Sequence, residues 1–347
     1  MSNFITRVQP GDKRTLAQVD ALLRQEGIER DANLDYTAAM MDDDYRVIAT
    51  GSCFSSTLRC FAVDHAHQGE GLLNEIVSHL MEVQSARGNY HLFLYTKPSA
   101  AKFFADIGFY EIARVEGRLV FMENRRDGFS AYLRALAADK KDSGVSAAVI
   151  MNANPFTLGH QYLAEQAASA CDTLHLFVVS EDASLIPATV RKRLVAEGVA
   201  HLPGVILHDC GPYIISSATF PSYFLKDRET IIESQARLDL AVFARIAQAL
   251  GISARYVGEE PQSQVTGIYN RVMQESLPAF GIRCVILPRK ESGGKPISAS
   301  TVRLCLQNGD FGALQQLVPA STLAYFESPE AAPVLERIRS AKDVVHY

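Results

Sequence analysis

The chain has 347 residues and a formal net charge of −5 at pH 7. At roughly 100–200 residues per domain, this length predicts two domains. With 48% hydrophobic and 21% charged residues, the composition is that of a globular protein and excludes a disordered or fibrous chain. The slight acidic excess argues against a nucleic-acid-binding protein, because such proteins usually carry a basic face.

The cysteines and the apolar stretches indicate the compartment. The six cysteines form no CxxC pair and fall in no zinc-ligand spacing. No stretch approaches the ~20 apolar residues of a membrane helix, and the N-terminal sequence lacks the apolar core of a signal peptide. We therefore expect a cytoplasmic protein with reduced thiols and no membrane contact.

The first part of the chain mixes short strands with helices. Apolar residues at helical spacing predict a helix over 12–27, another that begins at Leu72, and a third over 98–108. Strands are predicted at 5–9, 36–41, 45–54, 58–64, 91–97 and twice within 109–124. A short helix within 129–144 ends in a charged stretch, where we place the domain boundary.

A glycine-containing turn joins the strand at 58–64 to the helix that begins at Leu72. It contains Gln68, Gly69 and Gly71. Glycines allow the backbone to approach a ligand closely, and a helix N-terminus offers unpaired N–H groups to an anion. The turn is therefore a candidate binding site.

The second part alternates strictly between strands and helices. Strands are predicted at 145–151, 174–180, 204–209, 254–260 and 283–289. Helices are predicted at 160–170, 187–200, 266–278, 298–310 and 311–318, with two more within 222–251. Such alternation predicts a parallel sheet that helices cover on both faces. Right-handed connections place every loop that follows a strand at one edge of this sheet, where ligands bind.

Two polar segments stand at that expected edge. The first, 152–160, follows the first strand and holds Thr157 and His160 at a helix start, with Gly159 leaving room for a phosphate. The second, 295–303, follows the last strand. Its polar residues are Lys295, Ser298, Ser300, Thr301 and Arg303.

Together the two segments predict a polyphosphate site built from hydroxyls, helix N-termini and cations. Each part also has a simpler interpretation. His160 alone could be a helix-start histidine without a ligand, and the hydroxyls could be ordinary N-caps. Lys192 and Arg193 could reach phosphate or form a solvated basic face.

The motif Thr157-x-Gly159-His160 resembles the (H/T)xGH signature of the nucleotidyltransferase superfamily. Residues 297–303 resemble its second signature, ISSTxxR, with Ala299 in place of the first of two hydroxyls. The wider run over 145–320, which includes 214–227, resembles the citrate lyase ligase family. In the first domain, Gln68-x-x-Gly71 and the stretch 97–111 are similar to the GNAT acyltransferase fold, although Leu73 stands where a small residue is usual.

The resemblance implies an α/β protein of two domains. The expected boundaries are a GNAT-like mixed α+β domain at 1–130, a linker helix at 131–144, a Rossmann-like parallel-sheet nucleotidyltransferase domain at 145–330, and a C-terminal tail at 331–347.

The resemblance also implies a reaction. Members of the family join acetate to the thiol of the prosthetic group on the citrate lyase acyl-carrier subunit, with ATP cleaved to AMP and diphosphate through acetyl-adenylate. Mg²⁺ is expected to bridge phosphate oxygens, without metal ligands from the protein. Neither nucleic acid nor a membrane is expected as a partner.

The resemblance assigns roles to matching residues. His160 and Thr157 would bind the reacting phosphates, and Asn152 would face the α-phosphate or acetate. Gly258, Glu259 and Glu260 would contact adenosine. The β- and γ-phosphates would be held by Ser298, Ser300, Thr301 and Arg303, with Arg303 as the fixed cation. Lys295 would be a further phosphate ligand, and Gly159 would leave room for the phosphate. Gln68, Gly69 and Gly71 would hold the coenzyme-A-like prosthetic arm.

Two alternatives stay open from the sequence. One is an adenylyltransferase that makes a coenzyme A precursor at the same phosphate site. The other is an acetyltransferase in which the first domain carries the reaction.

Overall fold

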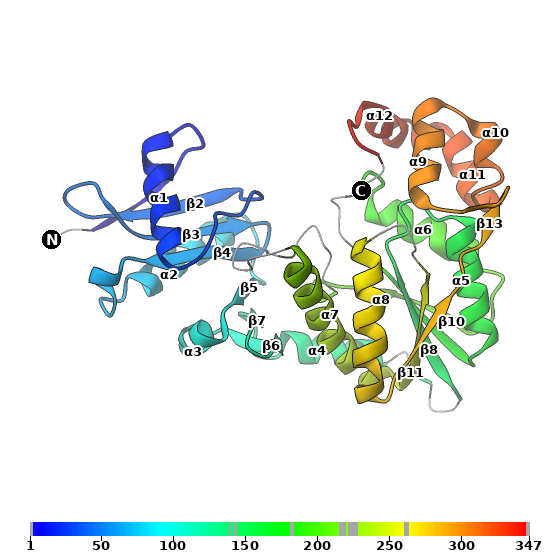
Figure 1. Cartoon of the computed structure of the whole chain (residues 1–347), viewed down its shortest axis with the longest axis horizontal. Helices are drawn as coiled ribbons and strands as arrows, with labels where there is room; N and C mark the ends of the chain where they lie inside the picture. Colours follow the sequence, from blue (N-terminus) through cyan, green and yellow to red (C-terminus); the bar gives the residue numbers. More distant parts are fainter. Residues whose placement is uncertain are drawn as a thin grey trace. The chain divides into compact units, whose positions relative to one another are not determined.

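The computed structural model describes residues 3–138, 140–141, 144–180, 184–214, 220, 228–259 and 264–344 (Figure 1). The chain divides into two compact units. The first unit contains Met1–Ser130 and Thr219–Ala241, and the second contains Ala131–Ala218 and Val242–Tyr347. The domain boundaries predicted from the sequence stay a prediction. They divide the chain into continuous segments, whereas the first unit consists of two segments that are separated in the sequence.

The first unit is built on a seven-stranded sheet. Only β4 and β5 run parallel in it, and the other neighbouring strands are antiparallel. Its strands, in spatial order, are β1 (Phe4–Arg7), β2 (Tyr36–Met41), β3 (Val47–Phe54), β4 (Thr57–Val63), β5 (Phe93–Thr96), β7 (Leu119–Glu123) and β6 (Tyr110–Val115).

Helices pack on both faces of this sheet. Its helices are α1 (Lys13–Gln25), the 3-10 helix η1 (His65–His67), α2 (Leu72–Ala86) and α3 (Pro98–Asp106). Ile76 and Leu80 of α2 pack with Ala38 and Met40 of β2. Leu22 and Leu23 of α1 pack with Ala39 and Met41 of the same strand. Because successive strand residues point to opposite faces, α1 and α2 cover opposite sides.

The described residues of the segment 219–241, which are 220 and 228–241, join the first unit through contacts with β5 and with the connection between β6 and β7. The rings of Tyr95 and Phe220 lie 5.8 Å apart, edge to face. Arg118 donates from Nη1 to Glu233 Oε2 at 3.1 Å. These contacts explain why a segment far along the sequence clusters with the N-terminal sheet.

The second unit contains a five-stranded sheet in which all strands are parallel. In spatial order the strands are β10 (Val205–Asp209), β9 (Thr173–Val178), β8 (Ser146–Met151), β11 (Ile252–Gly258) and β12 (Arg283–Leu287). The chain order reverses direction between β8 and β11, which is where ligands bind in open α/β sheets.

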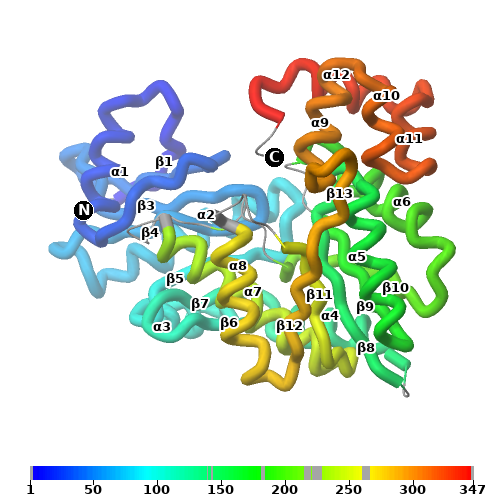
Figure 2. The backbone as a smooth tube through the Cα atoms, turned by 45° about the vertical axis from the view of Figure 1, so that its right-hand side comes forward, coloured from blue at the N-terminus to red at the C-terminus, as the bar shows by residue number. Residues whose placement is uncertain are grey.

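The remaining helices lie before, between and after these strands along the chain. They are α4 (Gly128–Ala137), α5 (Leu158–Ser169), α6 (Ala188–Val199), α7 (Arg228–Leu250), α8 (Gln264–Ser276), η2 (Leu277–Phe280), α9 (Ala299–Asn308), α10 (Phe311–Leu314), α11 (Ala320–Glu327), η3 (Pro329–Ala331) and α12 (Ala332–Ser340). The first residues of α4 and most of α7 count with the first unit. Figure 2 follows the orange chain from β12 through the small ribbon of β13 (Glu291–Ser292) and β14 (Lys295–Pro296) to α9.

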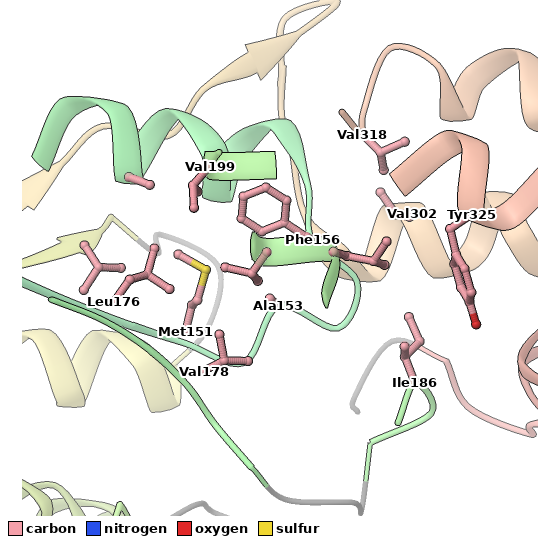
Figure 3. Packing of buried hydrophobic residues seen from close by; sticks show 14 of the residues in the cluster. Met151, Ala153, Phe156, Leu176, Val178, Ile186, Val199, Val302, Val318 and Tyr325 are labelled. Atoms are coloured by element: carbon pink, nitrogen blue, oxygen red, sulfur yellow. The ribbon is translucent and has the colours of Figure 1, made fainter. Parts of the chain in front are cut away.

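The core of the second unit anchors the loop after β8. Phe156 is fully buried in it, together with Met151, Val178 and Val302 (Figure 3). A Cβ added to Gly198 of α6 would lie 2.3 Å from the Phe156 ring, so this glycine provides the space that the ring occupies. The loop is therefore held by its own apolar residue, and the helix start that follows it is fixed in place.

The expected fold class is confirmed: a mixed α+β unit precedes a unit with a parallel sheet covered on both faces. Three details differ from the predictions. The β13–β14 ribbon was not expected, α7 is one long helix over its described part, and α12 packs into the core through Val334, Leu335 and Ile338. Among the described residues, no helix combines the length and apolar character needed to cross a membrane.

Candidate functional site

The loops that follow β8, β11 and β12 meet at the carboxyl edge of the parallel sheet. Asn152 follows β8 directly, while Gly258 ends β11. The Glu259 backbone N–H donates to Leu287 O at 2.8 Å, and the Glu259 backbone carbonyl oxygen accepts from Arg289 Nε at 2.8 Å. The ends of β11 and β12 are therefore tied together at this edge. Glu260 and most of 214–227 lie outside the described residues.

Thr157 and His160 form a reciprocal cap at the start of α5. The His160 backbone N–H donates to Thr157 Oγ1 at 3.3 Å, and the Thr157 backbone N–H donates to His160 Nδ1 at 3.1 Å. Since Nδ1 accepts a hydrogen bond, the ring proton of neutral His160 is on Nε2. The side chain therefore offers an Nε2–H donor beside the N-terminus of α5.

The charge state of His160 follows from its surroundings. Burial, and then the nearby positive charge of Arg289, lower the pKa of His160 from 6.5 to about 4. The imidazole is thus neutral at pH 7 and acts as a hydrogen-bond donor without a charge of its own. Arg289 supplies the positive charge at this position instead.

We expect His160 to stay neutral down to about pH 5 in the folded protein. The unfolded chain binds this proton near pH 6.5, whereas the folded chain binds it only near pH 4. The stabilising contribution is complete above pH 6.5 and is lost as the pH falls toward 4. An NMR titration of the His160 ring measures this directly, and a midpoint near 6.5 would show that the ring is not held as described.

The second segment gathers three hydroxyls at the start of α9. Ser298 is the N-cap, and its Oγ accepts from the Thr301 backbone N–H at 3.1 Å. The hydroxyl oxygens of Ser300 and Thr301 lie 2.9 and 2.8 Å from Ser298 Oγ. Ser298 and Ser300 are half-buried and Thr301 is exposed. The group forms a compact set of donors beside a helix N-terminus.

The two polar segments lie against each other, although they are far apart in the sequence. A Cβ added to Gly159 would lie 3.2 Å from Ile297 O and 3.8 Å from Ile297 Cβ. Arg303 Nη1 donates to Asn154 O at 2.6 Å. The start of α5 and the approach to α9 are therefore adjacent, and their N–H groups and side-chain donors converge on one region. Such a region suits a polyphosphate anion.

The comparisons with known proteins identify the family of the chain. Residues 146–326 match the family model described as the citrate lyase ligase C-terminal domain. The chain belongs to the citrate lyase ligase family. A citrate (pro-3S)-lyase ligase of Klebsiella pneumoniae is 40% identical over 331 residues, which cover 94% of this chain and 96% of the relative. One from Escherichia coli strain K12 is 35% identical, with 94% of each chain covered.

Solved structures that are similar to this ligase-family chain match its N-terminal part, about a third of its length. A putative acyl-CoA N-acyltransferase of Klebsiella pneumoniae is 20% identical, with a TM-score of 0.30, and covers 35% of this chain and 95% of its own. A GNAT-family acetyltransferase of Staphylococcus aureus is 13% identical, with a TM-score of 0.31, and covers 36% of this chain and 100% of its own.

Arg303 is expected to hold the β- and γ-phosphates as a fixed cation, but in this ligase-family chain its guanidinium is buried against backbone carbonyls. It is 2% exposed, and it donates from Nε to Val344 O and from Nη1 to Asn154 O, both at 2.6 Å. Burial lowers its pKa to about 10. Arg303 lies on the buried face of α9 with Val302 and Leu306, so its guanidinium fastens the loop after β8.

Replacing Arg303 with alanine is expected to lower the free energy of unfolding by about 3 kcal/mol, because two charge-assisted bonds to buried carbonyls are lost. The unfolding transition of the second unit in urea measures this change in free energy. Arg339→Ala, on the exposed side of α12, is the matched control and should change stability by less than about 0.5 kcal/mol. Equal effects of the two substitutions would contradict a structural role for Arg303.

The other expected cations divide into two groups. Lys295 is exposed on β14, next to the second segment. Lys192 bonds to Asp209 Oδ1 at 2.5 Å, and Arg193 bonds to Glu330 Oε1 at 2.9 Å, so both are engaged in surface ion pairs. Sequence reasoning missed Arg289 as a site residue. Its position at the end of the last predicted strand is the signal that could have identified it.

In the first unit, the turn that contains Gln68 has open space beside Gly69 and Gly71. Gly69 and Gly71 have φ of 87° and 82°, a region that favours glycine, and a Cβ on either would meet no atom within 4 Å. Gln68 Nε2 lies 2.9 Å from His65 Nδ1. Beside the turn, β4 and β5 are in register at only two positions, although β4 continues to Val63. The two strands therefore part beyond Leu58.

The residues that the structure describes hold no cluster of three or more His, Cys, Asp or Glu side chains arranged to bind a metal ion.

Proposed function

We propose that this chain is an ATP-dependent acid–thiol ligase that activates citrate lyase by acetylating the prosthetic-group thiol of its acyl-carrier subunit. Membership of the citrate lyase ligase family supports the reaction class. The single structural observation that carries the proposal is the contact between Gly159 and Ile297, which brings the starts of α5 and α9 together. ATP, acetate and the carrier thiol are the substrates, and six free cysteines suit a cytoplasmic enzyme.

In the first step, an acetate oxygen attacks the α-phosphorus of ATP. A new P–O bond forms, the bond to the bridging oxygen of the β-phosphate breaks, and diphosphate leaves with the bonding electrons. The protein contributes positioning and charge stabilisation without a covalent intermediate of its own. His160 Nε2–H would donate to a phosphate oxygen, which gains negative charge in the transition state. The neutral imidazole does this without transferring a proton.

The leaving diphosphate needs donors and positive charge around it. Ser298, Ser300 and Thr301, together with the backbone N–H groups at the starts of α5 and α9, would hold the β- and γ-phosphates. Lys295 and Arg289 would supply positive charge, while Arg303 holds the loop that carries Asn154. Mg²⁺ would enter as part of the substrate, bound to the phosphate oxygens of ATP.

The remaining ligands would lie at the same sheet edge. Gly258 and Glu259, which follow β11, would contact adenosine. Asn152, which follows β8, would face acetate or the α-phosphate. The location of these loops on either side of the reversal in strand order supports both assignments.

In the second step, the carrier thiolate attacks the acetyl carbonyl carbon. The C–S bond forms, the C–O bond to phosphate breaks, and AMP leaves. We propose that the first unit docks the prosthetic arm, with Gln68, Gly69 and Gly71 at its phosphates. The open space above the two glycines and the separation of β4 from β5 support this role.

The test is ATP–diphosphate exchange by the purified full chain with a panel of carboxylates, followed by mass spectrometry of deacetylated citrate lyase. Acetate-dependent exchange and the gain of one acetyl group on the carrier are expected. Exchange that requires a phosphopantetheine-like substrate instead would indicate an adenylyltransferase. Acetylation from acetyl-CoA without ATP would indicate an acetyltransferase.

A further inference from the structure

Arg191 is a buried cation beside the proposed reaction site that the proposed steps do not use. It lies on α6 and is 0% exposed. Its Nη1 donates to the backbone oxygens of Asn152 and Val179, both at 2.7 Å, and its Nε donates to Ile186 O at 3.0 Å. One side chain therefore ties together the ends of β8 and β9 and the segment that leads into α6.

The same guanidinium determines which way the Asn152 amide points. Nη1 of Arg191 also donates to Asn152 Oδ1 at 2.7 Å. Because a guanidinium has donors and no acceptor, the atom facing it must be the amide oxygen, and Nδ2 must point away from it. Within the described part of the chain, Nδ2 has only Ser184 Oγ as a partner, at 3.4 Å. Asn152 is exposed, and its amide nitrogen lies on the side of the amide away from Arg191.

The backbone at this point is also constrained. Ala153 has φ of 50°, a left-handed conformation that is unfavourable for a residue with a Cβ. Such a conformation persists only where the surroundings hold it. The bond from Arg191 to Asn152 O holds the peptide that precedes Ala153, and Ala153 is itself buried, at 1% exposure.

We infer that Arg191 is a positioning residue that presents the Asn152 amide as a hydrogen-bond donor to an oxyanion at the end of β8. The oxyanion is the carboxylate of acetate or the α-phosphate of ATP. This inference rests on the proposed function and adds to it the direction of the Asn152 hydrogen bond. It explains why an exposed amide is held by a fully buried guanidinium.

The first test is Asn152→Asp, which keeps an acceptor for Arg191 and replaces the outward donor with a second acceptor. Acetate-dependent exchange is expected to fall by about 100-fold or more, because the carboxylate repels the oxyanion. The thermal midpoint should be unchanged or higher, since the new carboxylate pairs with the guanidinium. Exchange that stays within about threefold of the wild type would overturn the inference.

The second test asks whether Arg191 acts through Asn152. Arg191→Lys is measured in the wild-type chain and in Asn152→Ala, with KM values for acetate and ATP. In the wild type, KM for the ligand that meets the amide is expected to rise by about 10-fold; in Asn152→Ala the same change should have little further effect. A rise in the acetate KM identifies the carboxylate, and a rise in the ATP KM identifies the α-phosphate.

Equal effects of Arg191→Lys in both backgrounds would show that it acts on the fold alone, and would overturn the inference. Lys192→Ala is the matched control, because this neighbouring cation pairs with Asp209 on the surface. If Arg191→Lys does not fold, Asn152→Asp decides the question.

Should the wild type show no exchange, the proposed reaction fails. Calorimetric titration of Mg-ATP and of acetate into Asn152→Asp and the wild type then tests the amide, and equal affinities would overturn the inference.

Discussion

Replacing His160 with alanine is expected to slow acetate-dependent ATP–diphosphate exchange by roughly 10²–10³-fold, the usual effect of removing one preorganised donor from a developing oxyanion. The change removes the Nε2–H donor and the acceptor for the Thr157 backbone N–H at 3.1 Å. It leaves the Thr157 side chain to cap α5, so the helix should still form. Initial rates of exchange, with circular dichroism and thermal unfolding of the same sample, measure the effect.

The matched control is His201→Ala. His201 is an exposed histidine of the same unit, with Nε2 at 3.2 Å from Glu165 Oε1, and it should exchange at the wild-type rate. A glutamine at position 160 carries an amide N–H in roughly the place of Nε2 and should recover part of the lost activity. Wild-type exchange in a folded His160→Ala protein would remove His160 from the site.

Gly159→Ala is expected to reduce kcat/KM for ATP by roughly 10–100-fold through displacement of the two helix starts, because errors of about 1 Å in positioning carry such costs. An added Cβ would lie 3.2 Å from Ile297 O, which is backbone and cannot rotate away as a side chain could. The two segments must therefore separate by a few tenths of an ångström. Steady-state kinetics over a range of ATP concentrations measure the change.

A second substitution, Gly159→Val, should enlarge the effect because it adds two more carbon atoms at the same contact. Gly267→Ala on the exposed side of α8 is the control, since a Cβ there meets no atom within 4 Å. It should preserve activity and add up to about 1 kcal/mol of stability through better helix propensity. Full activity of both Gly159 variants would show that close approach of α5 and α9 is not needed for ATP binding.

Much of the proposed site could be predicted from the sequence because it depends on chain connectivity. Thr157 and His160 follow one strand, and Ser298, Ser300 and Thr301 follow another in a domain of strictly alternating elements. In a parallel sheet, loops that follow strands share one edge. The expectation that these segments come together is met by the contact of Gly159 with Ile297.

The roles of the arginines could not be predicted in the same way. The motif match implies that Arg303 is a fixed cation on the phosphates, but its position on α9 turns it into the core, toward Asn154 O. Arg191 belongs to no recognised motif, although it donates a hydrogen bond to Asn152 Oδ1. The role of Arg289 shows in tertiary contacts: its Nε donates to Glu259 O, and its positive charge lowers the pKa of His160. The direction in which a long side chain points depends on its neighbours in the tertiary structure. The spacing of residues along the chain does not show which residues these neighbours are.

The sequence by itself determined the class of the fold and the identity of the polar segments, because hydrophobic periodicity and helix-start chemistry act over a few neighbouring residues. Only the tertiary structure decided that 228–241 packs with the first unit, that α12 completes the core of the second, and that Asn152 Oδ1 faces Arg191. Each of these depends on contacts between residues distant in the chain, whose burial and hydrogen bonding are established only when the elements pack together.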